Sequence, residues 1–265
     1  MINWNLEELK TRGYKINDRK PQDIEPIWRH SKKFGFPLPN FRGEETIYSG
    51  AEHTGNPKLP NITFLPGIIN HPYGSLIGST FGHQHTQYIK KDHRQFQEIY
   101  EFATYGGILL RKEKSVKLVL ARPGEKVVVG TDENMTLFNF GNTPLITLDY
   151  ANPQMNSATK DLEKEIGSPI AIWKTDYELT FRINPTYQER EIFEGKRNSI
   201  PIRAPKGEEA LYAEIKNKKT LFSEAGIEIA FGENLPGWLK EEFAKPLEQL
   251  VNERNKDLFN VLQIS

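Results

Sequence analysis

Two histidines separated by a single residue, His83 and His85, have the spacing that most directly suggests chemistry. Alternate residues of a β-strand point to the same face, so both imidazoles of an extended segment can bind one metal ion. Glu98 lies at the start of the strand-like segment EIYEF and offers a carboxylate to the same ion. Two histidines and a carboxylate that leave coordination positions open form a workable divalent-metal site. We therefore predict a metal site made by His83, His85 and Glu98.

The same region also has an ordinary structural interpretation. Histidines on a strand can be satisfied by hydrogen bonds within the protein, and a glutamate at the start of a strand is often a solvated edge residue. The neighbouring residues Ile99, Tyr100, Phe102 and Tyr105 are expected to be barrel core rather than a cofactor pocket. Asp149, near the end of a later strand-like segment, is interpreted as a residue that caps a turn.

The elements that must position these residues are short strands. Between residues 62 and 153 the chain alternates runs of apolar and β-branched residues with gaps that hold Gly, Pro, Asn or Asp. Regularly spaced short strands predict a mainly β fold, a closed or sandwiched antiparallel sheet of which the jelly-roll barrel is one form. The later segment IAIWKTDYELTFRIN predicts two further strands, and residues 157–166 predict a short helix.

Three segments are expected along the chain. Residues 1–60, rich in Pro, Gly and charge, predict a loop-rich N-terminal arm that wraps the barrel and begins with a short helix at residues 3–12. Residues 61–187 predict the barrel itself. Residues 188–265 predict a C-terminal extension with helices, because apolar residues return at helical spacing after residue 235.

Composition excludes several functional classes. The 265 residues carry 35 basic and 35 acidic side chains, so no strong field attracts nucleic acid or a membrane surface. The chain has no cysteine, so any metal must be bound by nitrogen and oxygen. The N-terminal segment lacks the apolar core of a signal peptide, and no run of about 18 apolar residues occurs. We expect a cytoplasmic protein.

Residues 62–187 resemble the cupin superfamily. Its first motif is G-x-H-x-H followed by a glutamate on the next strand, and its second contains P-G and N-x-G. The matching residues are Gly82, His83, His85 and Glu98 in the first motif, although the glycine here directly precedes the first histidine, and Pro123, Gly124, Asn139 and Gly141 in the second. Within cupins the layout is most similar to the archaeal and bacterial cupin-type glucose-6-phosphate isomerases, through Thr80, the E-x-Y of Glu98 and Tyr100, and the turn at Gly106 and Gly107.

This resemblance implies a metal-dependent aldose–ketose isomerase that interconverts glucose 6-phosphate and fructose 6-phosphate, or a related sugar phosphate. Glu98 and Tyr100 are the expected catalytic residues, and Thr80, Thr63 and Tyr100 the expected substrate-binding residues. The metal is expected to be iron, manganese, nickel or zinc. Cupin barrels commonly pair, so a homodimer is also expected.

Two departures from the family leave alternatives open, and the first is that the interval between His85 and Glu98 holds extra residues compared with the family's shorter turn. The second is that the position of the family's last histidine ligand falls near Met135, and a thioether is a poor ligand for hard or borderline divalent ions. Asp132, Glu133 or His93 could replace it, or the ion could keep an extra water. The lost ligand equally fits a non-catalytic barrel that binds a sugar or sugar phosphate or supports assembly. A third possibility is another cupin enzyme, such as an Fe(II) dioxygenase.

Overall fold

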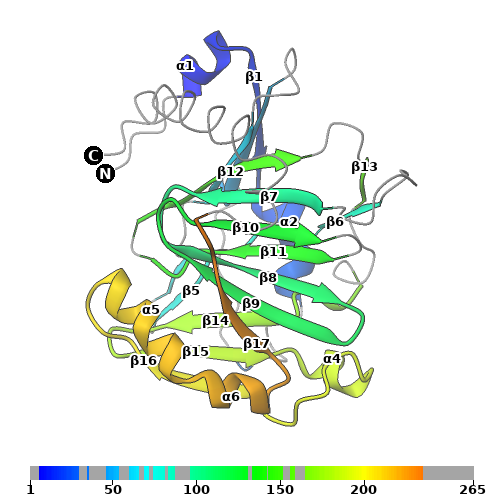
Figure 1. Cartoon of the computed structure of the whole chain (residues 1–265), viewed down its shortest axis with the longest axis vertical. Helices are drawn as coiled ribbons and strands as arrows, with labels where there is room; N and C mark the ends of the chain where they lie inside the picture. Colours follow the sequence, from blue (N-terminus) through cyan, green and yellow to red (C-terminus); the bar gives the residue numbers. More distant parts are fainter. Residues whose placement is uncertain are drawn as a thin grey trace.

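The computed structural model (Figure 1) describes residues 6–29, 35, 46–53, 60–65, 69–71, 74–80, 83–86, 96–130, 133–141, 143–151, 156–158 and 165–234. Its strands form three sheets, which are antiparallel apart from one pair described below. The first sheet consists, in spatial order, of β1 (Tyr14–Arg19), β2 (Tyr48–His53), β3 (Asn61–Leu65), β12 (Leu145–Ala151), β7 (Phe96–Phe102) and β10 (Lys126–Gly130).

The second sheet consists of β13 (Asn156–Ala158), β6 (His83–Thr86), β11 (Asn134–Phe138), β8 (Gly106–Lys112), β9 (Ser115–Ala121) and β17 (Glu228–Phe231). The third consists of β16 (Ser199–Arg203), β15 (Glu178–Ile183), β14 (Ile170–Lys174), β5 (Gly74–Leu76) and β4 (Ile69–His71). The described helices are α1 (Leu6–Thr11), α2 (Pro21–Arg29), α4 (Pro185–Glu189), α5 (Glu208–Asn217) and α6 (Lys219–Glu224). In Figure 1, α5 and α6 lie beside β15 and β16 at one end of the molecule.

Eight of the strands pair like a long hairpin folded over on itself. From its open end inward, β3 pairs with β12, β6 with β11, β7 with β10 and β8 with β9. Successive pairs belong alternately to the first and the second sheet. This is the strand order of a jelly roll. The predicted mainly β jelly-roll barrel is therefore confirmed.

Alternate residues of these strands fill the barrel. On β8, Ile108 and Leu110 belong to the interior cluster, whereas Leu109 between them belongs to a second core outside the barrel. The interior cluster consists of Leu65, Tyr100, Phe102, Ile108, Leu110, Val119, Ala121, Val127, Val129, Met135, Leu137 and Leu145. The second core joins the outer face of β8 and β9 to the third sheet and to α5 and α6. A third cluster covers the outer face of β3 and β12 with residues from α1 and β1.

Both ends of the described chain add strands to the barrel sheets. β2 pairs with β3, and β1 pairs with β2, so the N-terminal segment extends the first sheet. β17 adds to the edge of the second sheet by pairing in parallel with β9. The predicted division at residues 60 and 187 stays a prediction, but these pairings show that segments on either side of it share sheets with the barrel.

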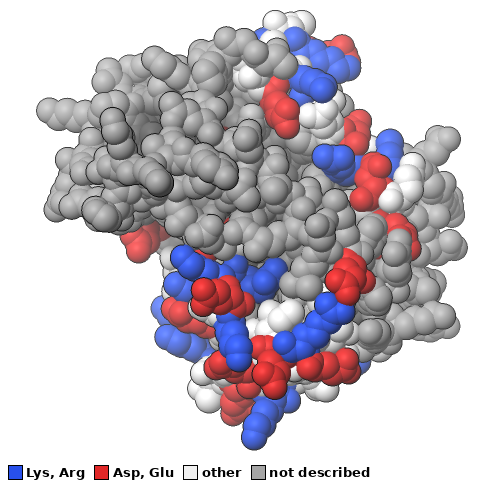
Figure 2. Space-filling model, turned by 90° about the vertical axis from the view of Figure 1, so that its right-hand side faces the viewer, with Lys and Arg blue, Asp and Glu red and all other residues white. Residues whose placement is uncertain are grey.

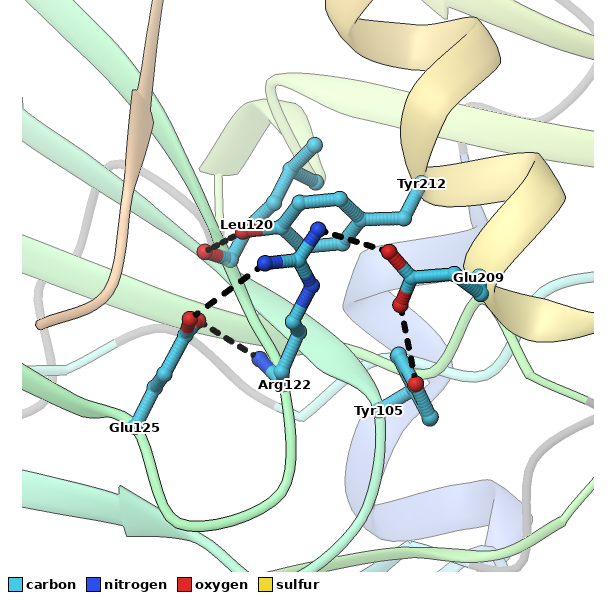
Figure 3. Close-up of polar contacts among 6 residues, drawn as sticks. All are labelled: Tyr105, Leu120, Arg122, Glu125, Glu209 and Tyr212. Carbon is cyan, nitrogen blue, oxygen red and sulfur yellow. Dashed lines mark hydrogen bonds and ion pairs between the residues drawn. The ribbon is translucent and has the colours of Figure 1, made fainter. Parts of the chain in front are cut away.

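A polar cluster fastens α5 to the turn between β9 and β10 (Figure 3). Arg122 donates from its guanidinium to Glu209 at 2.6 Å, and the guanidinium lies 4.5 Å from the centre of the Tyr212 ring. Glu209 also accepts the Tyr105 hydroxyl at 3.0 Å. The Tyr212 hydroxyl donates to the carbonyl of Leu120 at 3.2 Å. These contacts hold α5 against the end of the barrel where β7, β9 and β11 finish.

Two details of the sequence predictions have a clear outcome. The helix expected at residues 3–12 is present as α1. The helix expected over residues 157–166 is wrong at its start, because Asn156–Ala158 pairs as a strand with β6 and is therefore extended. The helices expected after residue 235 lie outside the described residues. No helix in the described part of the chain has the length and apolar character needed to cross a membrane.

Substitution Gly195→Ala should destabilise the fold strongly. A Cβ at Gly195 would overlap the backbone of Ala225, directly after α6, and backbone atoms cannot turn away as the end of a flexible side chain can. Such overpacking costs about 3 kcal/mol of unfolding free energy. The matched control is Gly50→Ala, where an added Cβ meets no atom within 4 Å, so a change of about 0.5 kcal/mol or less is expected. Urea unfolding measures both, and equal losses in the two variants would contradict the close approach.

Candidate functional site

The barrel lining changes from apolar to polar along three neighbouring strands of the first sheet. In order toward the polar end, the inward-facing residues are Phe102, Tyr100 and Glu98 on β7, Leu145, Thr147 and Asp149 on β12, and Leu65 and Thr63 on β3. The register sets Thr147 opposite Thr63, and Asp149 opposite Tyr100. The polar side chains therefore meet at one end of the barrel, away from the end that α5 covers.

Glu98 and Tyr100 form the centre of this polar region. The Tyr100 hydroxyl donates to Glu98 Oε2 at 2.5 Å, and both residues are buried. The same hydroxyl lies 3.8 Å from the sulfur of Met135 on β11. Next to Glu98, the ladder between β7 and β10 is irregular, because Glu98 pairs with Val129 and Phe96 with Gly130. Such bulges are common beside functional sites, where they adjust the direction of a side chain.

Asp149 brings a second carboxylate into the same interior. Thr147 donates its hydroxyl to Asp149 Oδ1 at 2.7 Å, and Thr63 donates to Oδ2 at 2.8 Å. Asp149 is 5% exposed. The interpretation of Asp149 as a turn cap is therefore wrong. The signal that could have identified it is the T-x-D spacing within LITLDYA, which places both side chains on one face of a strand.

Burial and mutual repulsion control the protonation of these groups. Burial raises the pKa of Asp149 well above its ordinary value, and the negative charge of Glu98 raises it further. The hydrogen bonds from Thr147 and Thr63 act in the opposite direction. Burial also raises the pKa of the Tyr100 phenol, and so do the charges of Glu98 and Asp149. The Tyr100 phenol therefore stays protonated and keeps a hydrogen to donate.

The predicted histidine pair lies on β6, next to β11. The register pairs His83 with Met135, and His85 with Ser157 of β13. The side chains of both histidines lie outside those that the structure describes, so the ligand pair stays a prediction. Among the side chains that are described, no group of three or more His, Asp and Glu could hold a metal ion. The register does show that Met135, a buried residue of the barrel interior, is the direct neighbour of position 83.

The two predicted substrate-binding threonines make internal hydrogen bonds. The Thr80 hydroxyl oxygen accepts from the amide of Leu137 at 3.0 Å, and Thr80 is buried. Thr63 donates to Asp149 as described above. Their contact with a substrate stays a prediction. Of the residues proposed to replace the missing histidine, Glu133 accepts from the amide of Gly130 at 2.6 Å and so closes its own turn. Asp132 and His93 lie outside the described residues.

The donor chemistry of this interior fits a divalent cation. Glu98 and Asp149 place two carboxylates in apolar surroundings, where the charge of one raises the pKa of the other. A bound cation would offset both charges and reverse that effect. Imidazole and carboxylate are suitable ligands for iron, manganese, nickel or zinc, whereas the thioether of Met135 is not. Binding of a divalent cation here would therefore depend on the histidines and carboxylates and not on Met135.

Comparisons with known proteins add little to this geometry. No protein-family model matches the sequence, and no curated protein matches it. Eleven chains of solved structures overlap parts of this chain, and three of them illustrate the likeness. An oxalate decarboxylase from Lactobacillus farciminis, in a formate complex, is 12% identical, covers 57% of this chain and 32% of its own, and has a TM-score of 0.29. An oxalate oxidase with the substrate analogue glycolate is 14% identical, with 57% and 56% coverage and a TM-score of 0.28.

The third structure is a cupin-superfamily sugar phosphate isomerase from Silicibacter pomeroyi. It is 12% identical, covers 59% of this chain and 76% of its own, and has a TM-score of 0.25. The chain thus spans 32% of the first of the three structures and 56% of the second. At such TM-scores these likenesses do not bear on function, and the jelly-roll assignment rests on the strand pairing described above.

In metal-free protein, Asp149→Asn should flatten the pH dependence of stability. The pKa of Asp149 is raised in the folded state, so the folded chain binds this proton more tightly than the unfolded chain does. Stability is therefore lost as the pH rises above the ordinary value of 3.8. Asparagine does not ionise, so the Tm of D149N relative to wild type should increase between about pH 5 and pH 8. Thermal unfolding in EDTA measures this difference.

The control is Tyr150→Phe, at the next position of β12, where Tyr150 packs against the cluster on the outer face. Its Tm should follow the wild-type curve in parallel. If the Tm of D149N also follows the wild-type curve in parallel across this pH range, ionisation of Asp149 does not destabilise the folded protein.

Proposed function

We propose that the chain is a metal-dependent aldose–ketose isomerase with a cupin-type barrel, and that its substrate is a sugar phosphate such as glucose 6-phosphate or fructose 6-phosphate. The observation that carries the proposal is the Glu98 carboxylate, 4% exposed and bound by the Tyr100 hydroxyl at the polar end of the barrel. Isomerisation moves a proton between adjacent carbons of the sugar. A carboxylate in a site poor in water is a suitable base for that transfer. The motif resemblance is what selects this reaction among those of cupins.

His83, His85 and Glu98 would hold the ion in this proposal. When bound, the ion supplies Lewis-acid stabilisation of negative charge on substrate oxygens. Iron, manganese, nickel and zinc all suit the ligand set, so supply and geometry decide among them. The proposal extends to a homodimer of barrels, as the resemblance implies.

The chain's own residues have distinct tasks. Glu98 accepts and returns the carbon-bound proton. Tyr100 donates to Glu98 Oε2, which fixes the orientation of the carboxylate and makes it a weaker base than an unbonded one. The apolar neighbours Val129 and Met135 exclude water from this part of the barrel. Thr63 lies on β3, and Thr80 lies beside β11, where it accepts from the amide of Leu137. Both are proposed to contact the sugar.

A second candidate is a non-catalytic barrel that binds a sugar or sugar phosphate. One observation favours it: Met135 is buried directly beside position 83, where an isomerase of this type would use a fourth ligand. In this alternative the interior polar groups bind hydroxyls of the sugar, and no proton is transferred to carbon.

Proton transfer to carbon distinguishes the candidates. Manganese-loaded wild type, incubated with fructose 6-phosphate in D2O, should form glucose 6-phosphate and exchange a carbon-bound hydrogen, both followed by NMR. Glu98→Gln should lower the rate by about 10²- to 10⁴-fold, because the amide cannot accept the proton. The control is Glu101→Gln, a buried glutamate on the opposite face of β7 that pairs with Lys126 at 3.7 Å; it should remain active.

Metal content is measured on the same samples. Elemental analysis should find metal in wild type and none in the double variant His83→Ala/His85→Ala. Metal binding without exchange or isomerisation of any hexose or pentose phosphate would favour the non-catalytic candidate. Oxygen consumption with a diketone or aromatic substrate would indicate a dioxygenase instead.

A further inference from the structure

We propose that Asp149 is the second carboxylate of the metal centre: its oxygen takes the place of the histidine missing at Met135, and its negative charge adds to that of Glu98. This inference rests on the proposed function, because it concerns the same ion. The inference goes beyond the proposed function, because neither the motifs nor the family resemblance points to Asp149.

Asp149 lies on the strand next to Glu98 and Tyr100. Asp149 pairs directly with Tyr100, and the Tyr100 hydroxyl bonds Glu98 and contacts the sulfur of Met135. Residues from β7 and β11 thus meet at this hydroxyl, and Asp149 of β12 lies opposite Tyr100 in the strand register. Both carboxylates act electrostatically on that phenol. Asp149 is therefore in the part of the barrel that Glu98 and Met135 define, although it lies in the other sheet from Met135.

Orientation is the second argument. Thr147 holds one carboxylate oxygen of Asp149 and Thr63 holds the other, so the carboxylate plane is fixed from two strands. Each carboxylate oxygen can accept about two hydrogen bonds or ligand contacts, so each retains one acceptor site after the threonine bond. Ligating carboxylates in metal sites are themselves hydrogen-bonded in this way. The two threonines are the partners that such a ligand needs.

Charge is the third argument. Neutral histidines and Glu98 alone would leave a divalent ion with an excess positive charge inside an apolar barrel, which is costly. Asp149 brings the second negative charge, and the site becomes neutral. Met135 contributes no charge and a poor donor. Glu133, the other described acid that could have replaced the histidine, is bound to the amide of Gly130 in its own turn.

The test is the affinity for Mn²⁺, measured by titration calorimetry and by the EPR signal of free Mn²⁺. Asp149→Asn keeps the shape of the side chain and one acceptor oxygen for a threonine, while the other threonine must turn its hydroxyl to accept from the amide. It removes the negative charge and should weaken binding by about 10- to 100-fold. Glu101→Gln removes a buried carboxylate from the other face of the same sheet and should leave the affinity unchanged. Thermal unfolding in EDTA shows that each variant is folded.

A second variant tests the replacement itself. Met135→His restores a nitrogen donor beside position 83, so it should recover much of the Mn²⁺ affinity that D149N loses when the two substitutions are combined. If Asp149→Asn and the folded double variant Asp149→Asn/Met135→His bind Mn²⁺ equally weakly, Asp149 does not take the place of that donor.

The outcomes separate this inference from the proposed function. Wild-type affinity in D149N, together with loss of binding in His83→Ala/His85→Ala, would remove Asp149 from the centre and leave the proposed function intact. Absence of Mn²⁺, Fe²⁺ and Zn²⁺ binding in wild type would overturn both. Weak binding in D149N and unchanged binding in E101Q would support the assignment.

Discussion

The alternation of side chains along β7 is the constraint on which the candidate site depends. β7 lies between β12 and β10, and both neighbours fix its register. That register directs Glu98 and Tyr100 into the barrel and Glu101 to the outer face, where it pairs with Lys126. Because the period is two, a slip by one residue would exchange the two sets and place Glu101 inside the barrel and Glu98 on the outer face. Hydrogen bonds between backbones therefore decide which carboxylate is available for chemistry.

The polar end of the barrel combines buried acids with neutral donors. Every described hydrogen bond to Asp149 and Glu98 in this interior comes from a hydroxyl, of Thr63, Thr147 or Tyr100. Hydroxyls stabilise a carboxylate without cancelling its charge, so the negative charge of an ionised acid here remains for a cation to neutralise. An interior of that kind binds a cation more readily than a neutral ligand. The apolar half of the barrel, filled by Phe102, Leu145 and their neighbours, provides the rigid floor beneath it.

Many strands of the barrel could be predicted from local sequence patterns. The elements that were not predicted, β16 and α5, lack those patterns for physical reasons. Short apolar runs separated by Gly and Pro predicted β8 to β12, and the hairpin of β14 and β15 was predicted from IAIWKTDYELTFRIN. β16 was missed because SIPIR contains Pro201; an edge strand tolerates proline, and β16 lies at the edge of its sheet. α5 was missed because its N-cap is Gly207 and no side chain caps it, so the usual start signal is absent.

The candidate site could be predicted only in part. Two-residue spacing predicted the pair His83 and His85, the strand-like segment EIYEF added Glu98, and the E-x-Y pattern added Tyr100. This ligand set stays a prediction. The same spacing links Thr147 and Asp149, but an aspartate near the end of a strand more often caps a turn, so the residue was assigned to the commoner role. Only the pairing of β12 with β7 shows that it lies opposite Tyr100. Contacts between distant segments are not encoded in local patterns, which is why the second carboxylate was missed.

The parallel pairing of β17 with β9 has a consequence for synthesis on the ribosome. Ile229 pairs with Leu118, so the outer edge of β9 stays uncovered until more than a hundred further residues have been made. The outermost barrel pair, β3 with β12, also joins segments that are far apart in the chain. Non-local pairing of this kind slows folding, and an open strand edge invites association with other chains. The nascent protein therefore exposes this strand edge throughout the synthesis of the residues that separate β9 from β17.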